Sequence, residues 1–127
     1  MDEAPQIIDR DDPYVKYANG VVFDSNTGLE WLAGPGKNMS WKEAQEWTEN
    51  LEIDGRGWRM PTRQELETLY QEGKGKRNLT RLLETPSWWV WSAEPDDGLS
   101  SSLFDFSHGI RDWQSRTPRA YAVRVRK

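Results

Sequence analysis

The chain has 127 residues, the size of one domain, and a formal net charge of -4. This acidic balance disfavours sequence-independent binding of nucleic acid, which needs a basic surface to neutralise phosphates, so we expect no nucleic-acid partner. The absence of cysteine excludes disulfides, thiol nucleophiles and thiolate metal sites. Although 35% of the residues are hydrophobic, eight Trp, four Tyr and three Phe give the chain enough large side chains for a core.

The N-terminal residues differ from the rest of the chain. Residues 1–16 are polar and interrupted by two prolines, which predicts an N-terminal arm ahead of one domain that spans residues 17–127. The first residues are acidic, whereas a secretion signal is basic and then apolar, and no apolar run is long enough to span a membrane. We therefore expect no membrane insertion, and an extracytoplasmic location, periplasmic or at the cell surface, only if a leader has been removed.

The first regular elements after this arm form a hairpin. Val21–Phe23 and Leu29–Trp31 are apolar runs that flank the turn-forming residues Asp24–Gly28. This pattern predicts two short strands joined by an Asx/Gly turn.

Two helices are predicted next, each by a capping box. In such a box a Ser or Thr ahead of the helix and a Glu three residues later satisfy the free amides of the first turn. Ser40 begins one box and Thr62 begins the other, and apolar residues follow each at helical spacing. We predict helices over residues 41–51 and 63–72, with Gly73 ending the second.

The C-terminal half is predicted to be β-structure. Residues 88–92, 103–106 and 121–125 are rich in aromatic and β-branched side chains. Strands that follow a block of helices favour an α+β fold over a parallel βαβ sheet. Side chains alternate between the two faces of a strand, so we expect Trp89 and Trp91 to face the core and Trp88 to be exposed.

Several motifs of mixed chemistry occur in a fixed order, and the most specific is Trp58-Arg59-Met60-Pro61-Thr62-Arg63-x-Glu65-Leu66. The others are Asn19–Asp24, Thr27–Trp31, Ser40-Trp41-x-x-Ala44, Trp91-Ser92 and Val123–Arg126. With these motifs the chain, from about residue 17 to residue 126, resembles the Lcl C-terminal domain family of bacterial proteins.

The resemblance implies a C-type lectin-like fold, in which two helices pack on small antiparallel sheets. It also implies a bacterial surface or extracytoplasmic protein. Some members of the family form the tips of collagen-like adhesins that bind sulfated polysaccharides, whereas many have no assigned function.

The residues themselves give little support to catalysis or metal binding. His108 is the one histidine, and no Ser lies in a strand-turn-helix elbow that could pair with it, so we expect a non-catalytic protein. Glu94-Pro95-Asp96 is similar to one calcium loop of calcium-dependent lectins, but the second loop is missing because Arg111 precedes Asp112-Trp113. We expect neither a metal nor another cofactor.

The candidate ligand-binding region extends from about Glu94 to Arg116. It combines an aromatic surface with charged donors and acceptors, and it lacks clear core periodicity. The predicted ligand-binding residues are His108, Arg111, Asp112, Trp113 and Arg116, together with Trp88.

Two hypotheses follow for what this region binds. In the first, the domain recognises a carbohydrate or an acidic polysaccharide; in the second, exposed aromatic side chains form a protein-interaction or oligomer interface of a larger surface assembly.

Overall fold

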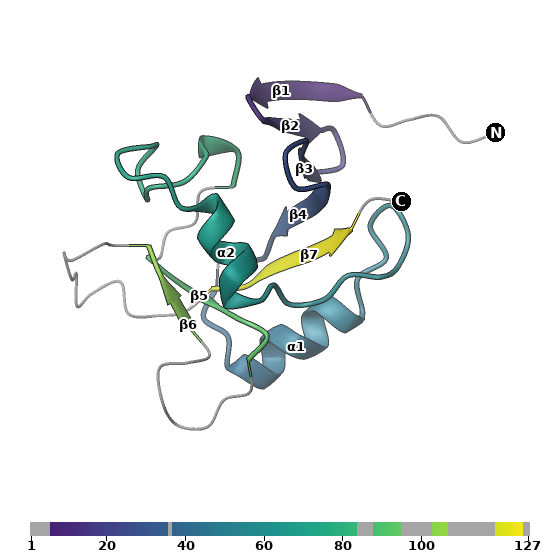
Figure 1. The fold of residues 1–127 in the computed structure, drawn as a ribbon. Helices are drawn as coiled ribbons and strands as arrows, with labels where there is room; N and C mark the ends of the chain where they lie inside the picture. The colour runs from purple at the N-terminus through teal and green to yellow at the C-terminus, as the bar shows by residue number, and fades with distance from the viewer. Residues whose placement is uncertain (1–5, 36, 84–87, 95–102, 107–118, 126–127) are drawn as a thin grey trace.

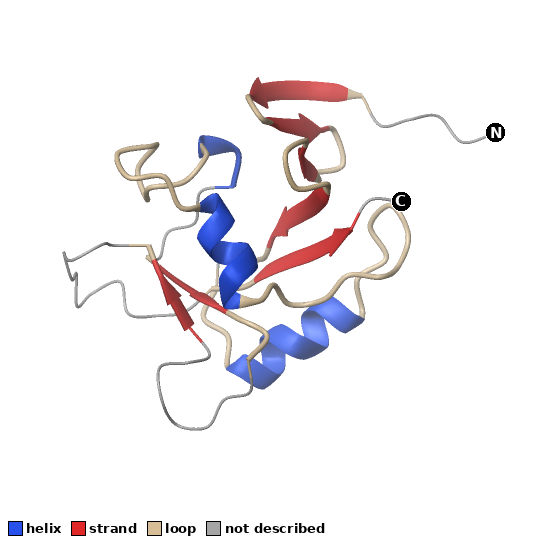
Figure 2. Ribbon diagram, viewed as in Figure 1, coloured by secondary structure: helices blue, strands red, loops and turns tan. Residues whose placement is uncertain are grey.

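The protein has an α+β fold of two helices and small antiparallel sheets, seen in a computed structural model (Figure 1). The structure describes residues 6–35, 37–83, 88–94, 103–106 and 119–125. Within them, Figure 2 shows strands, helices and loops by colour. The fold class predicted from the order of the elements is therefore confirmed.

The larger sheet has five antiparallel strands in the order β1-β2-β3-β4-β7. The strands are β1 (Ile7–Asp11), β2 (Tyr14–Tyr17), β3 (Val22–Asp24), β4 (Leu29–Ala33) and β7 (Tyr121–Val125). The predicted hairpin is the β3–β4 pair, whose turn is closed when the Asp24 carboxylate accepts hydrogen bonds from the Asn26 amide and the Thr27 hydroxyl. Because β7 pairs with β4, the C-terminal strand closes the sheet against its N-terminal half.

Both predicted helices are present, and both begin at their capping boxes. They are α1 (Trp41–Glu49) and α2 (Arg63–Leu69), capped by Ser40 and Thr62. α2 ends earlier than predicted because Tyr70 is already extended, with its amide bonded to the Glu67 carbonyl. Residues 71–80 instead form a loop in which the Gln71 amide donates to the Asn78 carbonyl.

A second, two-stranded sheet consists of β5 (Trp89–Trp91) and β6 (Leu103–Asp105). Leu66 and Leu69 of α2 are fully buried in the main core, where they meet residues from both sheets. Figure 1 shows α2 between the five-stranded sheet and the β5–β6 pair. A 3-10 turn, η1 (Arg81–Leu83), adds two more buried leucines to this core.

The N-terminal residues form strands where an arm was predicted. From Ile7 onward the chain forms β1 and β2, the outermost pair of the large sheet. Two ion pairs join β1 to distant residues, Asp9 with Arg81 at 2.6 Å and Asp11 with Lys74 at 2.8 Å. Partners so far along the chain leave no local pattern in the sequence, so the residues from Ile7 onward resemble an exposed arm there.

The faces of β5 are also reversed with respect to the prediction. Val90 is the fully buried residue of this strand, whereas Trp89 and Trp91 are only partly buried. Trp91 packs in a smaller cluster with Met60 and Trp41, and this cluster forms part of the pocket described next. The sequence shows three tryptophans close together, but it does not show that Trp91 packs in a second, smaller cluster.

Candidate functional site

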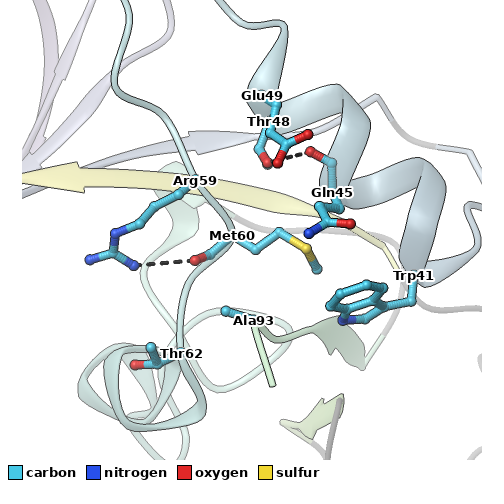
Figure 3. A pocket seen from close by; sticks show the side chains of 8 residues that line it. All are labelled: Trp41, Gln45, Thr48, Glu49, Arg59, Met60, Thr62 and Ala93. Atoms are coloured by element: carbon cyan, nitrogen blue, oxygen red, sulfur yellow. Dashed lines mark hydrogen bonds between the residues drawn. The ribbon is translucent and has the colours of Figure 1, made fainter. Parts of the chain in front are cut away.

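A pocket of about 380 Å³ lies between α1 and the segment that precedes α2. Its size falls within the range of roughly 300–1,000 Å³ that is usual for small-molecule sites. The lining residues are shown in Figure 3: Trp41, Gln45, Thr48, Glu49, Arg59, Met60, Thr62 and Ala93.

One wall of the pocket is a single face of α1. Trp41, Gln45, Thr48 and Glu49 are spaced by four, three and one residues, so they follow one another along the same side of the helix. The Ser40 capping box fixes where the helix begins and therefore which side chains this face carries.

The opposite wall is the extended segment from Arg59 to Thr62. The backbone of Arg59 pairs with Val123 of β7 through two hydrogen bonds of 3.0 and 2.8 Å, which hold the segment against the sheet. Ala93 joins this wall because its amide donates to the Pro61 carbonyl at 2.7 Å.

The Trp41 ring is held in place at one end of the pocket. Its indole N–H donates to the Ser92 carbonyl at 2.8 Å, and the Trp91 indole donates to the Met39 carbonyl at 2.7 Å. Figure 3 shows the Met60 side chain extending towards the Trp41 ring. The indole nitrogen is thus occupied, and the ring contributes an apolar surface to the pocket.

The positive charge at the pocket is already paired. The Arg59 guanidinium donates to both carboxylate oxygens of Glu65, at 2.8 and 2.7 Å. Burial opposes ionisation of Glu65, but the hydrogen bonds from Arg59 and from the Thr62 amide outweigh it, so the pKa of Glu65 lies below its ordinary value. The same pairing raises the pKa of Arg59. The two side chains form a neutral, bidentate unit at the edge of the pocket.

Two polar side chains of α1 are available to a ligand. Within the described part of the chain, the Gln45 amide and the Glu49 carboxylate have no hydrogen-bond partner. Gln45 is half-buried and Glu49 is exposed. The neighbouring Thr48 hydroxyl is used internally, since it donates to the Gln45 carbonyl at 2.8 Å.

The lining residues offer a ligand both apolar and polar contacts. The lining residues combine apolar surfaces with an amide and a carboxylate, and they include neither histidine nor a Ser paired with a base. Among the residues that the structure describes, no group of three His, Asp or Glu side chains is placed to hold a metal ion.

The residues predicted to bind ligand lie elsewhere or outside the described residues. Trp88 is half-buried against the main core, with the Arg77 guanidinium 4.7 Å from its ring centre, so the expectation that it is exposed is wrong. It does not line the pocket. Outside the described residues are His108, Arg111, Asp112, Trp113 and Arg116.

Glu94, the first residue of the candidate calcium loop, has a structural contact. Its carboxylate oxygens accept from the Arg63 amide at 3.1 and 3.4 Å, at the first turn of α2. Pro95 and Asp96 are outside the described residues.

The pocket itself was missed from the sequence. From the sequence, Thr62 was interpreted only as the cap of α2, and no ligand-binding role was given to the residues that line the pocket. One sequence pattern could have indicated this pocket. Gln45 and Glu49 lie four and eight residues after Trp41, so the three side chains lie on the same side of the helix.

Comparison with known proteins identifies the family. Within its described residues the structure has no helix that is long and apolar enough to cross a membrane. No curated protein and no solved structure matches the sequence significantly. The sequence does match the Lcl C-terminal domain over residues 20–126, which is most of the chain. The protein therefore belongs to the Lcl C-terminal domain family.

Proposed function

We propose that this domain is a non-catalytic recognition module that binds carbohydrate in the pocket between α1 and residues 59–62. The observation that carries the proposal is that a fixed Trp ring shares this pocket with two polar side chains that have no partner among the described residues. The apolar face of a sugar ring packs against an aromatic ring, while its hydroxyl groups need nearby donors and acceptors.

Each part of the pocket has a role in this proposal. Trp41, Met60 and Ala93 supply the apolar contact, and Met60 adapts its shape to the ligand because its thioether chain is unbranched. The Gln45 amide donates and accepts hydrogen bonds, whereas the Glu49 carboxylate only accepts them. Because Trp41 is already held by Ser92, binding need not restrict its rotation, which lowers the entropic cost.

The ligand-binding region predicted from the sequence follows directly after a pocket residue along the chain. Ala93 lines the pocket, and the predicted ligand-binding region begins at the next residue, Glu94. We propose that this region extends the same site and that the domain acts at a bacterial surface, as the lectin-like fold implied by the family suggests. An acidic polysaccharide would then be recognised by Arg111 and Arg116.

The test begins with a glycan array, followed by titration of the best-binding sugar into the wild-type protein and two variants. Gln45→Ala removes a hydrogen-bonding group of the pocket and should weaken binding about tenfold, since one lost hydrogen bond is worth roughly 1 kcal/mol or more. Lys42→Ala is the matched control, because Lys42 is exposed on the same helix but does not line the pocket. If Gln45→Ala and the wild type bind the sugar with equal affinity, the sugar does not bind in this pocket.

A second candidate function is protein interaction or oligomerisation, and one observation favours it. β1 is the edge strand of the large sheet, and its residues Ile7 and Ile8 are 40% and 58% exposed. Exposed edge strands with apolar side chains can pair with another chain. Size-exclusion chromatography with light scattering would support this function if the protein is an oligomer that Ile8→Lys converts to a monomer. A monomer at all concentrations would count against self-association.

A further inference from the structure

We propose that the carbohydrate recognised by this pocket is uncharged and that the pocket discriminates against sulfated and carboxylated sugars. The inference rests on the proposed function, because it specifies the ligand of the same site. The charges around α1 and the spacing of the lining residues along this helix support it.

The end of the pocket at Glu49 is negatively charged. Glu49 is the last residue of α1, and Glu46 lies one turn before it, whereas the last turn of the helix contains no basic residue. The carbonyl groups at the C-terminal end of a helix add a partial negative charge of their own. An anionic group on a ligand would therefore be repelled at this end.

The cation that lines the pocket does not offset this repulsion. Arg59 binds Glu65 through both of its terminal nitrogens, and the same carboxylate accepts from the Thr62 amide at 2.9 Å. The Glu65 carboxylate already neutralises the guanidinium, so a sulfate placed beside Arg59 would also meet a bound negative charge and would gain less than it would from an unpaired arginine. The Arg59 Nη1 group also donates to the Met60 carbonyl at 3.2 Å, so most of its hydrogen-bonding capacity is used within the protein.

The dimensions of the pocket suit more than one sugar ring. Glu49 lies eight positions after Trp41, which corresponds to roughly 12 Å along the helix axis at 1.5 Å per residue. The apolar residues gather at the Trp41 end, where Figure 3 shows Trp41, Met60 and Ala93 close to one another. A β-linked disaccharide whose hydroxyl groups are all equatorial has flat C–H faces for this end and hydroxyl groups for Gln45 and Glu49.

The experiment compares cellobiose with its 6-sulfate at low ionic strength. Binding is followed by NMR, through the Trp41 indole and Gln45 amide signals, so that the readout reports this pocket. We expect cellobiose to shift both signals and to bind about tenfold more tightly than the sulfated sugar, because exposed like charges a few ångströms apart repel by roughly 1 kcal/mol or more. Added salt should narrow this difference, since ions screen exposed charges.

A pair of variants identifies the source of the discrimination. Glu49→Gln removes the charge but keeps an oxygen acceptor, so the sulfated sugar should gain affinity relative to cellobiose and the difference between the two sugars should shrink. Glu46→Gln is the control, because this residue is also an exposed glutamate of the last turn but does not line the pocket. Glu46→Gln should change the difference in affinity between the two sugars less than Glu49→Gln does.

The possible failures are distinguishable. The inference is overturned, while the proposed function stands, if the Trp41 and Gln45 signals show that the sulfated sugar binds as tightly as cellobiose. The same holds if Glu49→Gln leaves the difference in affinity between the two sugars unchanged. If neither sugar shifts the two signals, the proposed carbohydrate pocket fails with it. Intact protein spectra for each variant confirm that a loss of binding is not a loss of folding.

Discussion

Trp41 and Trp91 each donate an indole hydrogen bond to the backbone beside the other. The Trp41 N–H binds the Ser92 carbonyl, and the Trp91 N–H binds the Met39 carbonyl. Together the two bonds join the start of α1 to the end of β5, segments about fifty residues apart in the sequence. They hold one end of the candidate pocket in a defined shape, because Trp41 lines it and Ser92 precedes Ala93.

We expect Trp41→Phe and Trp91→Phe each to destabilise the protein by about 1–3 kcal/mol, since each leaves a carbonyl without its donor and creates a small void. The two effects should not add, because both bonds connect the same two segments. The double variant should deviate from the sum by roughly 0.5 kcal/mol or more. Urea unfolding of the four proteins measures this coupling, and simple additivity would show that the two bonds act independently.

Thr62 has two functions, as the cap of α2 and as a residue that lines the pocket. Its hydroxyl accepts from the Glu65 amide, and the Glu65 carboxylate accepts in return from the Thr62 amide. Thr62→Ala should lower the free energy of unfolding by about 1 kcal/mol, whereas Thr62→Ser keeps the cap and should have a much smaller effect. Thermal unfolding of both variants tests this, and equal losses would mean that the methyl group, not the cap, is what stabilises the helix.

Gly34 lies where the sheet leaves no room for a side chain. A Cβ atom at this position would be 2.5 Å from the Ala120 carbonyl oxygen, which also accepts the Gly34 amide hydrogen bond at 2.8 Å. Gly34→Ala should therefore destabilise the protein by about 1–3 kcal/mol, because backbone must move. Ala33→Ser, at the exposed neighbouring position, should stay within about 0.5 kcal/mol of the wild type. Denaturant midpoints for the two variants provide the comparison.

The helices and the central hairpin were predictable because their signals are local. A capping box spans four residues, and the Asp24–Gly28 turn is complete within five, so each pattern is visible in a short stretch of sequence. The strands near the N-terminus were not predictable in this way. β1 carries three charged residues, and Asp9 and Asp11 have their partners about seventy residues later, so its pattern resembles that of an exposed arm.

The pocket could not be predicted for a related reason. It brings together one face of α1, the entry into α2 and the end of β5, and no spacing rule connects these three segments. Trp41 also belongs to a small apolar cluster, so its core character concealed its second role as a pocket wall. The orientation of β5 was missed because a strand of aromatic residues allows either face to be buried.

Acid should weaken the protein through carboxylates that are held ionised in the fold. The hydrogen bond from Arg81 is the main reason that the pKa of Asp9 falls from its ordinary 3.8 to about 2. Burial opposes ionisation of Asp11, but hydrogen bonds from Lys74 and Thr80 outweigh it, so its pKa is also lowered. Such groups stabilise the fold above the pKa of the unfolded chain, and this stabilisation is lost as pH falls through the lower pKa of the folded state.

The free energy of unfolding should therefore change little from neutral pH to about pH 5 and then decrease towards about pH 2. Denaturant titrations at each pH measure the curve. Asp9→Asn removes one titrating group and should give a shallower decrease below about pH 4. Asp12→Asn, at a nearby exposed carboxylate, serves as the control. A wild-type curve that stays flat throughout this acid range would contradict the prediction.

Glu30 and Arg124 form an ion pair that is almost fully buried. Glu30 of β4 lies directly opposite Arg124 of β7, and the Arg124 Nε atom is 2.7 Å from a Glu30 carboxylate oxygen. The two side chains are only 4% and 12% exposed. Arg124 also binds Asp54 at 3.1 Å and covers the ring of Trp58, so it joins the loop after α1 to the sheet.

Breaking such a pair on one side leaves a buried charge without its partner, whereas replacing both members by apolar residues removes the desolvation cost as well. Glu30→Leu alone should cost about 3 kcal/mol, at the low end of the usual range, because Asp54 still binds the guanidinium. Glu30→Leu combined with Arg124→Leu should be more stable than Glu30→Leu, since the two introduced leucine side chains would then pack on each other and on Trp58. Urea unfolding of the two single variants and the double variant tests this order. A double variant as unstable as the sum of the single ones would show instead that the contacts of Arg124 with Asp54 and Trp58 are what stabilise this side of the sheet.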